Sequence, residues 1–170
     1  MARAGGATTA RSYDRRVLTP AAAAVRAALR AAGASGEPVR FDASVPTAAA
    51  AAVALGCDVA AIANSLVFRV DDAPLLVVAS GAARVDTDLV SGIVGGRLRR
   101  ASPEFVLEHT GQEVGGVAPL GHPRRLRALV DVELDAHEVV WAGGGDHLTM
   151  FPTSYPELLR LTGGAPAVVR

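Results

Sequence analysis

Residues 65–80, SLVFRVDDAPLLVVAS, are the segment that most constrains the fold of this chain. Two runs rich in β-forming residues flank Asp71-Asp72-Ala73-Pro74, a composition typical of a tight turn. Leu75 to Val78 form a continuous apolar run, as expected of a central strand that is covered on both faces. The segment therefore predicts an antiparallel hairpin at the centre of a sheet, with further layers of structure on both sides.

The remaining elements surround this hairpin. Thr19-Pro20 and Ser102-Pro103 are typical helix starts, with a capping hydroxyl followed by proline, and glycines follow the ends of most apolar runs. Helices are predicted near 20–32, 47–55, 86–94, 103–110 and 154–161, and strands near 39–42, 98–101, 127–132, 138–142 and 147–151. Helices and strands do not alternate strictly, so the expected fold class is mixed α/β, with one largely antiparallel central sheet surrounded by helices. We expect a flexible N-terminal tail at 1–16 and a single domain at 17–170.

The bulk composition excludes several classes of protein. Half of the 170 residues are hydrophobic, and the formal net charge is zero, which argues against a strongly basic nucleic-acid binder. No run of about 18 apolar residues lacks a charge, so no membrane span is predicted, and the early arginines precede no apolar run of the kind found in secretory signals. The single cysteine, Cys57, cannot form an internal disulfide. These features predict a cytoplasmic protein.

Common motifs for nucleotide, metal or serine-nucleophile chemistry do not occur. The sequence contains no Walker A loop, no GxGxxG after a strand, no HExxH and no GxSxG. The four histidines, at 109, 122, 137 and 147, lack the spacing of metal ligands and are interpreted as surface or capping residues. We therefore expect neither a metal nor a cofactor.

The stretch TGQEVGGVAPLGHP, residues 110–123, combines four glycines and two prolines with three apolar residues. Glycines remove the side-chain wall of a loop, so that a ligand can approach the backbone closely, and Pro119 would fix the exit of the loop. A structural turn accounts for the same composition. The pattern alone leaves both interpretations open.

All seventeen basic residues are arginine, and the chain has no lysine. Six of the arginines lie in two clusters, RLRR and RRLR, that comprise Arg97, Arg99 and Arg100, and Arg124, Arg125 and Arg127. Such clusters are either solvated strand edges or groups that contact phosphates. The absence of lysine means that no side-chain amine is present to take part in chemistry.

The order of several segments resembles a known family. AVALGCDVAAIANSLVF, the hairpin, LLVVASGAARVD, EHTGQEVGGVAPLGHP and ELLRLTGG are similar to the YbaK/ProX family over about residues 20–165. These are freestanding aminoacyl-tRNA editing domains, similar to the insertion domain of bacterial prolyl-tRNA synthetases. The most specific part is TGxxxGG followed by Pro and Gly, and the GxxxP loop of the family falls on Gly115 to Pro119.

The resemblance implies a reaction, the hydrolysis of the ester that joins a wrong, small amino acid to the 3′-terminal adenosine of a tRNA. The ester is already activated, so the protein must mainly orient it, stabilise developing charge and admit a water. In the family, backbone groups of the GxxxP loop are thought to hold the aminoacyl adenosine. The resemblance implies Asn64, Gly115 and Gly116 as catalytic residues, and Ser80, Gly81, Val117, Pro119, Ala142 and His147 as substrate-binding residues. If tRNA is the substrate, we expect the six clustered arginines to contact its phosphates.

Two departures from the family pattern leave alternatives open. A lysine usual before the hairpin is Asn64 here, which can donate and accept hydrogen bonds but has no charge. A serine usual before the late Gly-Gly pair is Ala142. The chain is predicted to be a deacylase acting in trans, with aminoacyl-tRNA as its substrate and a synthetase as a second candidate partner, as a monomer or weak homodimer. The alternatives are a catalytically silent member that binds tRNA or an aminoacyl ligand, and a small-metabolite binder. Asn64 would then be an ordinary strand residue.

Overall fold

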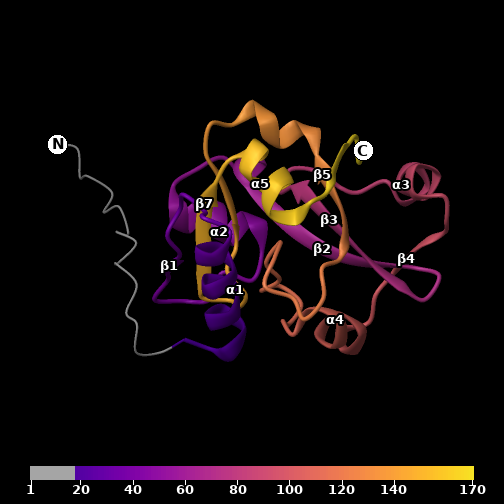
Figure 1. Cartoon of the computed structure of the whole chain (residues 1–170). Coiled ribbons are helices and arrows are strands. Elements are labelled where there is room, and N and C mark those ends of the chain that lie inside the picture. The colour runs from indigo at the N-terminus through magenta and orange to yellow at the C-terminus, as the bar shows by residue number, and fades with distance from the viewer. Residues whose placement is uncertain (1–17) are drawn as a thin grey trace.

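An eight-stranded mixed sheet forms the centre of the structure, a computed structural model that describes residues 18–170 (Figure 1). The predicted tail at 1–16 lies outside the described residues. The strands follow the order β1-β7-β6-β2-β3-β5-β8, and β4 pairs with β2 off this path. Their bounds are β1 Val39–Arg40, β2 Ile62–Val70, β3 Ala73–Ser80, β4 Leu98–Arg100, β5 Arg127–Asp131, β6 Val140–Gly143, β7 Thr149–Thr153 and β8 Ala165–Ala167.

The predicted hairpin is β2–β3, and its turn is tighter than expected. Val70 pairs with Ala73, so the turn consists of Asp71 and Asp72 alone, and Asp71 adopts φ 52°. A positive φ is tolerated by aspartate and is required by the turns that suit two-residue hairpins. Pro74 belongs to β3, where its missing N–H costs no ladder bond because β5 pairs with β3 only from Leu75 onward. The strand β2 also starts three residues earlier than predicted, at Ile62.

The edge of β2 opposite β3 is shared by two strands. At its start, β2 pairs in parallel with β6, and at its end it pairs antiparallel with β4. Between these pairings, residues 64–67 have no strand partner on that edge within the described chain. Of the seven strand pairings, four are antiparallel and three are parallel, which confirms the predicted mixed fold with a mostly antiparallel sheet.

Four of the five helices are capped by a hydroxyl, and two of these caps, Thr19 and Ser102, were predicted. The hydroxyls of Thr19, Thr47, Ser102 and Ser154 each accept a hydrogen bond from a backbone N–H of the first helical turn. The five helices are α1 Pro20–Ala31, α2 Ala48–Leu55, α3 Thr87–Val94, α4 Pro103–Thr110 and α5 Tyr155–Thr162, with short 3₁₀ turns η1 Val59–Ala61 and η2 Val132–Ala136. In Figure 1, α1 and α2 gather at one end, while α3 and α4 lie at the other. Among residues 18–170, no helix is long and apolar enough to cross a bilayer.

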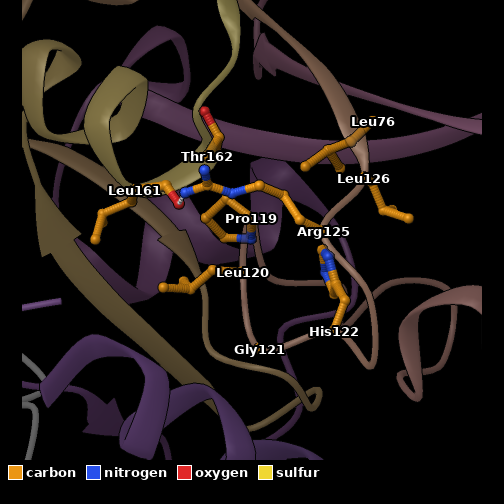
Figure 2. A pocket seen from close by; sticks show the side chains of 9 residues that line it. All are labelled: Leu76, Pro119, Leu120, Gly121, His122, Arg125, Leu126, Leu161 and Thr162. Atoms are coloured by element: carbon orange, nitrogen blue, oxygen red, sulfur yellow. Dashed lines mark hydrogen bonds between the residues drawn. The ribbon is translucent and has the colours of Figure 1, made fainter. Parts of the chain in front are cut away.

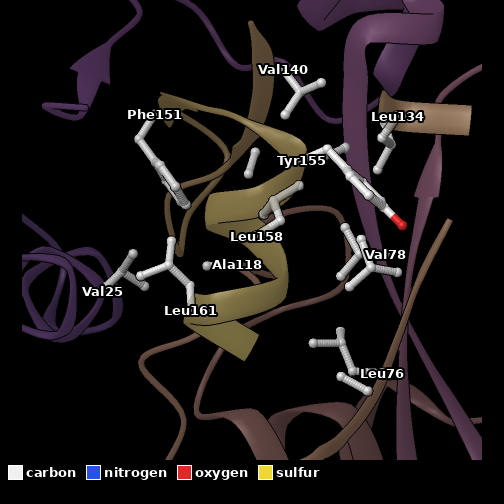
Figure 3. Close-up of a cluster of buried hydrophobic side chains, with 14 of the residues drawn as sticks. Val25, Leu76, Val78, Ala118, Leu134, Val140, Phe151, Tyr155, Leu158 and Leu161 are labelled. Carbon is white, nitrogen blue, oxygen red and sulfur yellow. The ribbon is translucent and has the colours of Figure 1, made fainter. Parts of the chain in front are cut away.

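The apolar run of β3 packs on both faces of the sheet, as predicted. Leu76 and Val78 contribute to a large buried cluster that includes Val25 of α1 and Leu158 of α5 (Figure 3). Their neighbours Leu75 and Val77 face the opposite side and join a cluster with Val90 of α3. A third cluster forms under α2 and contains Ile62, Ala51 and Met150. Alternation along the strands therefore tells which face each residue of the sheet occupies.

Candidate active site

The glycine loop, here residues 111–121, leaves α4 through Gly111 and leads to β5. Its middle lies directly against the β6–β7 connection: an ideal Cβ on Gly116 would be 2.8 Å from Cα of Asp146. An ideal Cβ on Gly143, at the end of β6, would be 2.5 Å from the carbonyl oxygen of Val117. These glycines therefore accommodate the chain's own backbone. A bulky residue at Gly116 would require one of the two segments to move, because the space beside Gly116 is already filled by the backbone of Asp146.

Gly115 brings three segments together. It has φ 89°, and an ideal Cβ there would lie 3.2 Å from Cε1 of His147 and 3.4 Å from the carbonyl oxygen of Pro46. The Nε2 atom of His147 is buried and has no hydrogen-bond partner, while its carbonyl accepts the N–H of Val45 at 2.8 Å. The predicted residues Gly115 and His147 are thus neighbours, and the imidazole offers an unused polar atom beside the loop.

The sheet register shows which face of the sheet Asn64 occupies. Ala63 of β2 pairs in parallel with Ala142 of β6, so the next residues along the two strands are Asn64 and Gly143. Ala63 and Ala142 both join the cluster under α1 and α5, so Asn64 and Gly143 face the other side of the sheet. The Val117 carbonyl lies against Gly143 on that side. Asn64 is half-buried and is the third residue of β2; its catalytic role stays a prediction.

Ser80, Gly81 and Ala142 lie nearby but are engaged in the scaffold. The Ser80 hydroxyl donates to the Ala60 carbonyl at 2.8 Å, and its N–H donates to the buried carboxylate of Asp131 at 3.0 Å. An ideal Cβ on Gly81 would be 2.5 Å from the Val59 carbonyl oxygen. Ala142 is fully buried, on the face opposite Asn64. Their predicted contacts with substrate stay predictions.

A cavity of about 130 Å³ lies on the α5 side of the loop (Figure 2). Of the predicted site residues, it is lined only by Pro119 and Arg125. The full lining consists of Leu76, Pro119, Leu120, Gly121, His122, Arg125, Leu126, Leu161 and Thr162. The guanidinium of Arg125 approaches the Leu161 carbonyl at 3.5 Å, at the C-terminus of α5, where a cation complements the helix dipole. The cavity is thus separate from the position of Asn64, Gly115 and Gly116.

The six clustered arginines are exposed, but they do not form one surface. Arg100 pairs with Phe68 and Arg127 pairs with Leu75, so both face the α3 side, where Arg127 also donates to the Val94 carbonyl at 3.3 Å. Arg99 faces the opposite side by alternation, and Arg125 lies at the C-terminus of α5. Their predicted contact with tRNA remains a prediction.

Sequence reasoning missed two residues that hold the loop in place. Gln112 is 1% exposed and makes two hydrogen bonds to the loop through its side chain. Asp146 accepts bonds from the Thr19 hydroxyl and the Leu148 N–H, both at 2.9 Å, while its backbone contacts Gly116. Nothing in the sequence distinguishes Gln112 from an exposed polar loop residue. The Asp146 contact also could not be predicted, because it joins segments far apart in the chain.

Titratable groups do not gather as a metal site would require. Across residues 18–170, no group of three or more His, Cys, Asp or Glu side chains is placed to hold a metal ion. The polar groups that lie beside the glycine loop include the backbone of Asp146 and the His147 imidazole.

Comparison with known proteins identifies the family. A model described as "Aminoacyl-tRNA editing domain" matches residues 42–161, well over half of the chain. The chain therefore belongs to the aminoacyl-tRNA editing domain family, as the resemblance indicated, and this is a family of editing deacylases.

Relatives support this assignment over different lengths. The chain is 34% identical over 119 residues to the uncharacterized protein YwhH of Bacillus subtilis, covering 69% of this chain and 76% of that protein. It is 33% identical over 75 residues to a proline–tRNA ligase of Desulfitobacterium hafniense, covering 43% of this chain but only 13% of the ligase. A crystal structure described as a candidate trans-editing enzyme for prolyl tRNA synthetase superposes with a TM-score of 0.86 at 40% identity, covering 91% of this chain and 99% of that one. The crystal structure of the hypothetical protein APE2540 superposes with a TM-score of 0.80 at 28% identity, covering 86% of this chain and 98% of that one.

Proposed function

We propose that this chain is an aminoacyl-tRNA deacylase that acts in trans on esters of small amino acids. The observation that supports the proposal is the close approach of the glycine loop to the β6–β7 connection, with Gly115 beside His147 and Val117 against Gly143. The match to nearly the full length of a candidate trans-editing enzyme supports a role as a freestanding protein. An editing role also agrees with the partial match to a proline–tRNA ligase.

The reaction needs little from side chains. Water attacks the carbonyl carbon of the ester, negative charge develops on the carbonyl oxygen, and the ribose 3′ oxygen leaves and takes up a proton. Products are the free amino acid and the uncharged tRNA. The N–H of Gly116 is bonded to the Glu113 carbonyl and that of Ala118 to Gln112. The N–H groups of Gly115 and Val117 and the Asn64 amide would then stabilise the developing charge, because preorganised donors need no reorientation during the reaction.

The neutral side chain at position 64 lowers the rate of ester hydrolysis that we expect. A lysine in its place would offer a charged donor, and charge-assisted hydrogen bonds are roughly twice as strong as neutral ones. Losing a whole oxyanion donor costs about 10²–10³ in rate, so exchanging a charged donor for a neutral one should cost less. We therefore expect a slow deacylase in which the loop backbone is the main stabilising element.

The arginines would supply the tRNA contacts. They are exposed and carry guanidinium groups suited to phosphate. Because the net charge is zero, we expect weak, salt-sensitive binding, with a synthetase as a second candidate partner.

A second candidate function follows from Asn64 itself. A chain that lacks the charged donor of the family could bind tRNA or an aminoacyl ligand without hydrolysing it. The same site could equally hold a small metabolite. Both alternatives predict binding without turnover.

Single-turnover hydrolysis of a panel of mischarged tRNAs tests the proposal. Radiolabelled Ala-, Ser-, Gly- and Pro-tRNA would be incubated with excess protein, and ester loss would be compared with the spontaneous rate. We expect accelerated hydrolysis of at least one small aminoacyl ester. If no ester is hydrolysed faster than spontaneously while tRNA binding is measurable, the silent-binder alternative is correct.

A further inference from the structure

The buried side chain of Gln112 makes two hydrogen bonds to the backbone of the glycine loop. Gln112 is 1% exposed, and its Oε1 accepts the N–H of Ala118 at 2.7 Å. Its Nε2 donates to the Leu120 carbonyl at 3.2 Å. The backbone of Gln112 is itself fixed, because its N–H donates to the Thr110 hydroxyl, which in turn donates to the Gln112 carbonyl, both at 3.0 Å. One side chain thus bridges two points of the loop.

A histidine completes this arrangement. Nε2 of His122 donates to the carbonyl of Ala118 at 2.8 Å, which fixes the tautomer, since a carbonyl can only accept. Both polar groups of Ala118 are therefore held by side chains of Gln112 and His122. Pro119 has no N–H, so between 118 and 120 the loop directs three polar groups toward these two side chains. Buried hydrogen bonds of this kind specify one conformation, because a buried polar group that is left unpaired is costly.

We propose that Gln112 and His122 form a brace that sets the conformation of the glycine loop, and that they are positioning residues for deacylation. The claim about rate rests on the proposed function. Gly115, Gly116 and Val117 immediately precede the braced segment and contact His147, Asp146 and Gly143. Donors that stabilise a transition state must be held within about 0.5 Å of their productive positions. Neither brace residue needs to touch the substrate, since both act through the backbone of Ala118 and Leu120.

The experiment replaces the glutamine by an apolar residue of similar length. Gln112→Met removes both bonds to the loop, and Thr162→Val serves as a matched control, because Thr162 is 3% exposed and its hydroxyl bonds within α5 and to Gly164. Amide hydrogen exchange of residues 113–121 would be measured in the free protein. Single-turnover hydrolysis would be measured on the best ester of the panel, and tRNA affinity separately.

We expect at least tenfold faster exchange of the Ala118 amide in Gln112→Met, and a rate of ester hydrolysis about 10- to 100-fold lower. The affinity for tRNA should not change, and Thr162→Val should change neither loop exchange nor rate. If Gln112→Met does not fold, Gln112→Glu provides the second variant. Its carboxylate still accepts from Ala118 but cannot donate to Leu120, so protection of Ala118 should persist while the rate falls.

If the Ala118 amide of Gln112→Met exchanges at the wild-type rate, the brace is refuted. If Gln112→Met hydrolyses the ester at the wild-type rate, the positioning role is refuted. A wild-type protein that hydrolyses no ester would instead refute the proposed function and the positioning role with it. The exchange data alone would then decide whether the brace exists.

Discussion

Replacing Gly116 with alanine should destabilise the protein, although the change adds a single methyl group to a loop. The new Cβ would lie 2.8 Å from both Cα and the carbonyl carbon of Asp146. Non-bonded carbons are separated by about 3.5–4.0 Å at their optimum, so one of the two segments must move by roughly 0.7–1.2 Å. Asp146 cannot move easily, because its carboxylate is bonded to Thr19 and Leu148.

Such overpacking typically costs about 1–3 kcal/mol. For a chain of this size each kcal/mol lowers the melting temperature by about 2–4 °C, so we expect Gly116→Ala to melt about 2–12 °C below wild type, and Gly116→Val lower still. Thermal unfolding followed by circular dichroism or calorimetry measures this directly.

Gly92→Ala is the matched control. Gly92 lies inside α3, and an ideal Cβ there has no atom within 4 Å. Alanine in a helix interior is favoured over glycine by about 0.5–1 kcal/mol, so this variant should be more stable than wild type. Should Gly116→Ala melt at the wild-type temperature, the close contact between the glycine loop and the β6–β7 connection would be refuted.

Three further predictions concern the site and its surroundings. Asn64→Ala removes a whole donor and should lower the single-turnover rate by up to about 10²–10³, while Asn64→Lys should preserve or raise it. Equal rates for all three active proteins would remove Asn64 from the site. Each arginine cluster would be replaced by alanine in turn, Arg97, Arg99 and Arg100 in one variant and Arg124, Arg125 and Arg127 in the other. The slope of log affinity for tRNA against log salt concentration should become shallower by about 0.7–0.9 for each phosphate that the variant no longer neutralises. The cluster whose replacement leaves the slope unchanged lies away from the tRNA. Burial lowers the pKa of His122, a shift that its bond to the Ala118 carbonyl partly opposes. The folded state therefore favours the neutral imidazole, and its contribution to stability is present above the ordinary pKa of about 6.5 and is lost as the pH falls from there toward the lowered value. The free energy of unfolding would be measured by urea denaturation at pH 7.5 and 5.5 for wild type and His122→Gln. It should fall less in the variant than in wild type between these pH values, and equal falls would contradict the prediction.

Local sequence patterns predicted most of the elements because those patterns act within a few residues. The capping hydroxyls of Thr19 and Ser102 and the β-forming runs around Asp71 depend only on neighbouring chain. The strand β8 could not be predicted, since Ala165-Pro166-Ala167 is poor in β-forming residues and becomes a strand only by pairing with β5. Tertiary contact overrides propensity there.

The sequence patterns around the glycine loop did not predict its geometry. The glycine spacing indicated that backbone approaches something closely at 115–119, but not that Gly116 rests on Asp146. The buried state of Gln112 depends on how the loop folds back upon it, and a polar residue between glycines carries no information about burial. The two faces occupied by the arginines follow from strand register, which the sequence alone does not fix.

The distance in sequence between the parts of the site has a consequence for biosynthesis. Thr19 and Asp146, which bond directly, are 127 residues apart, and β2 acquires its partner β6 only after most of the chain exists. At about 5–20 residues per second, roughly 4–15 s pass between synthesis of the β2–β3 hairpin and of β7. During that interval the strands that later become most central are edge strands with apolar residues on both faces, the condition under which nascent chains aggregate. Folding of this protein should therefore be slow and dominated by distant contacts, and a fragment that ends before His147 lacks part of the proposed site.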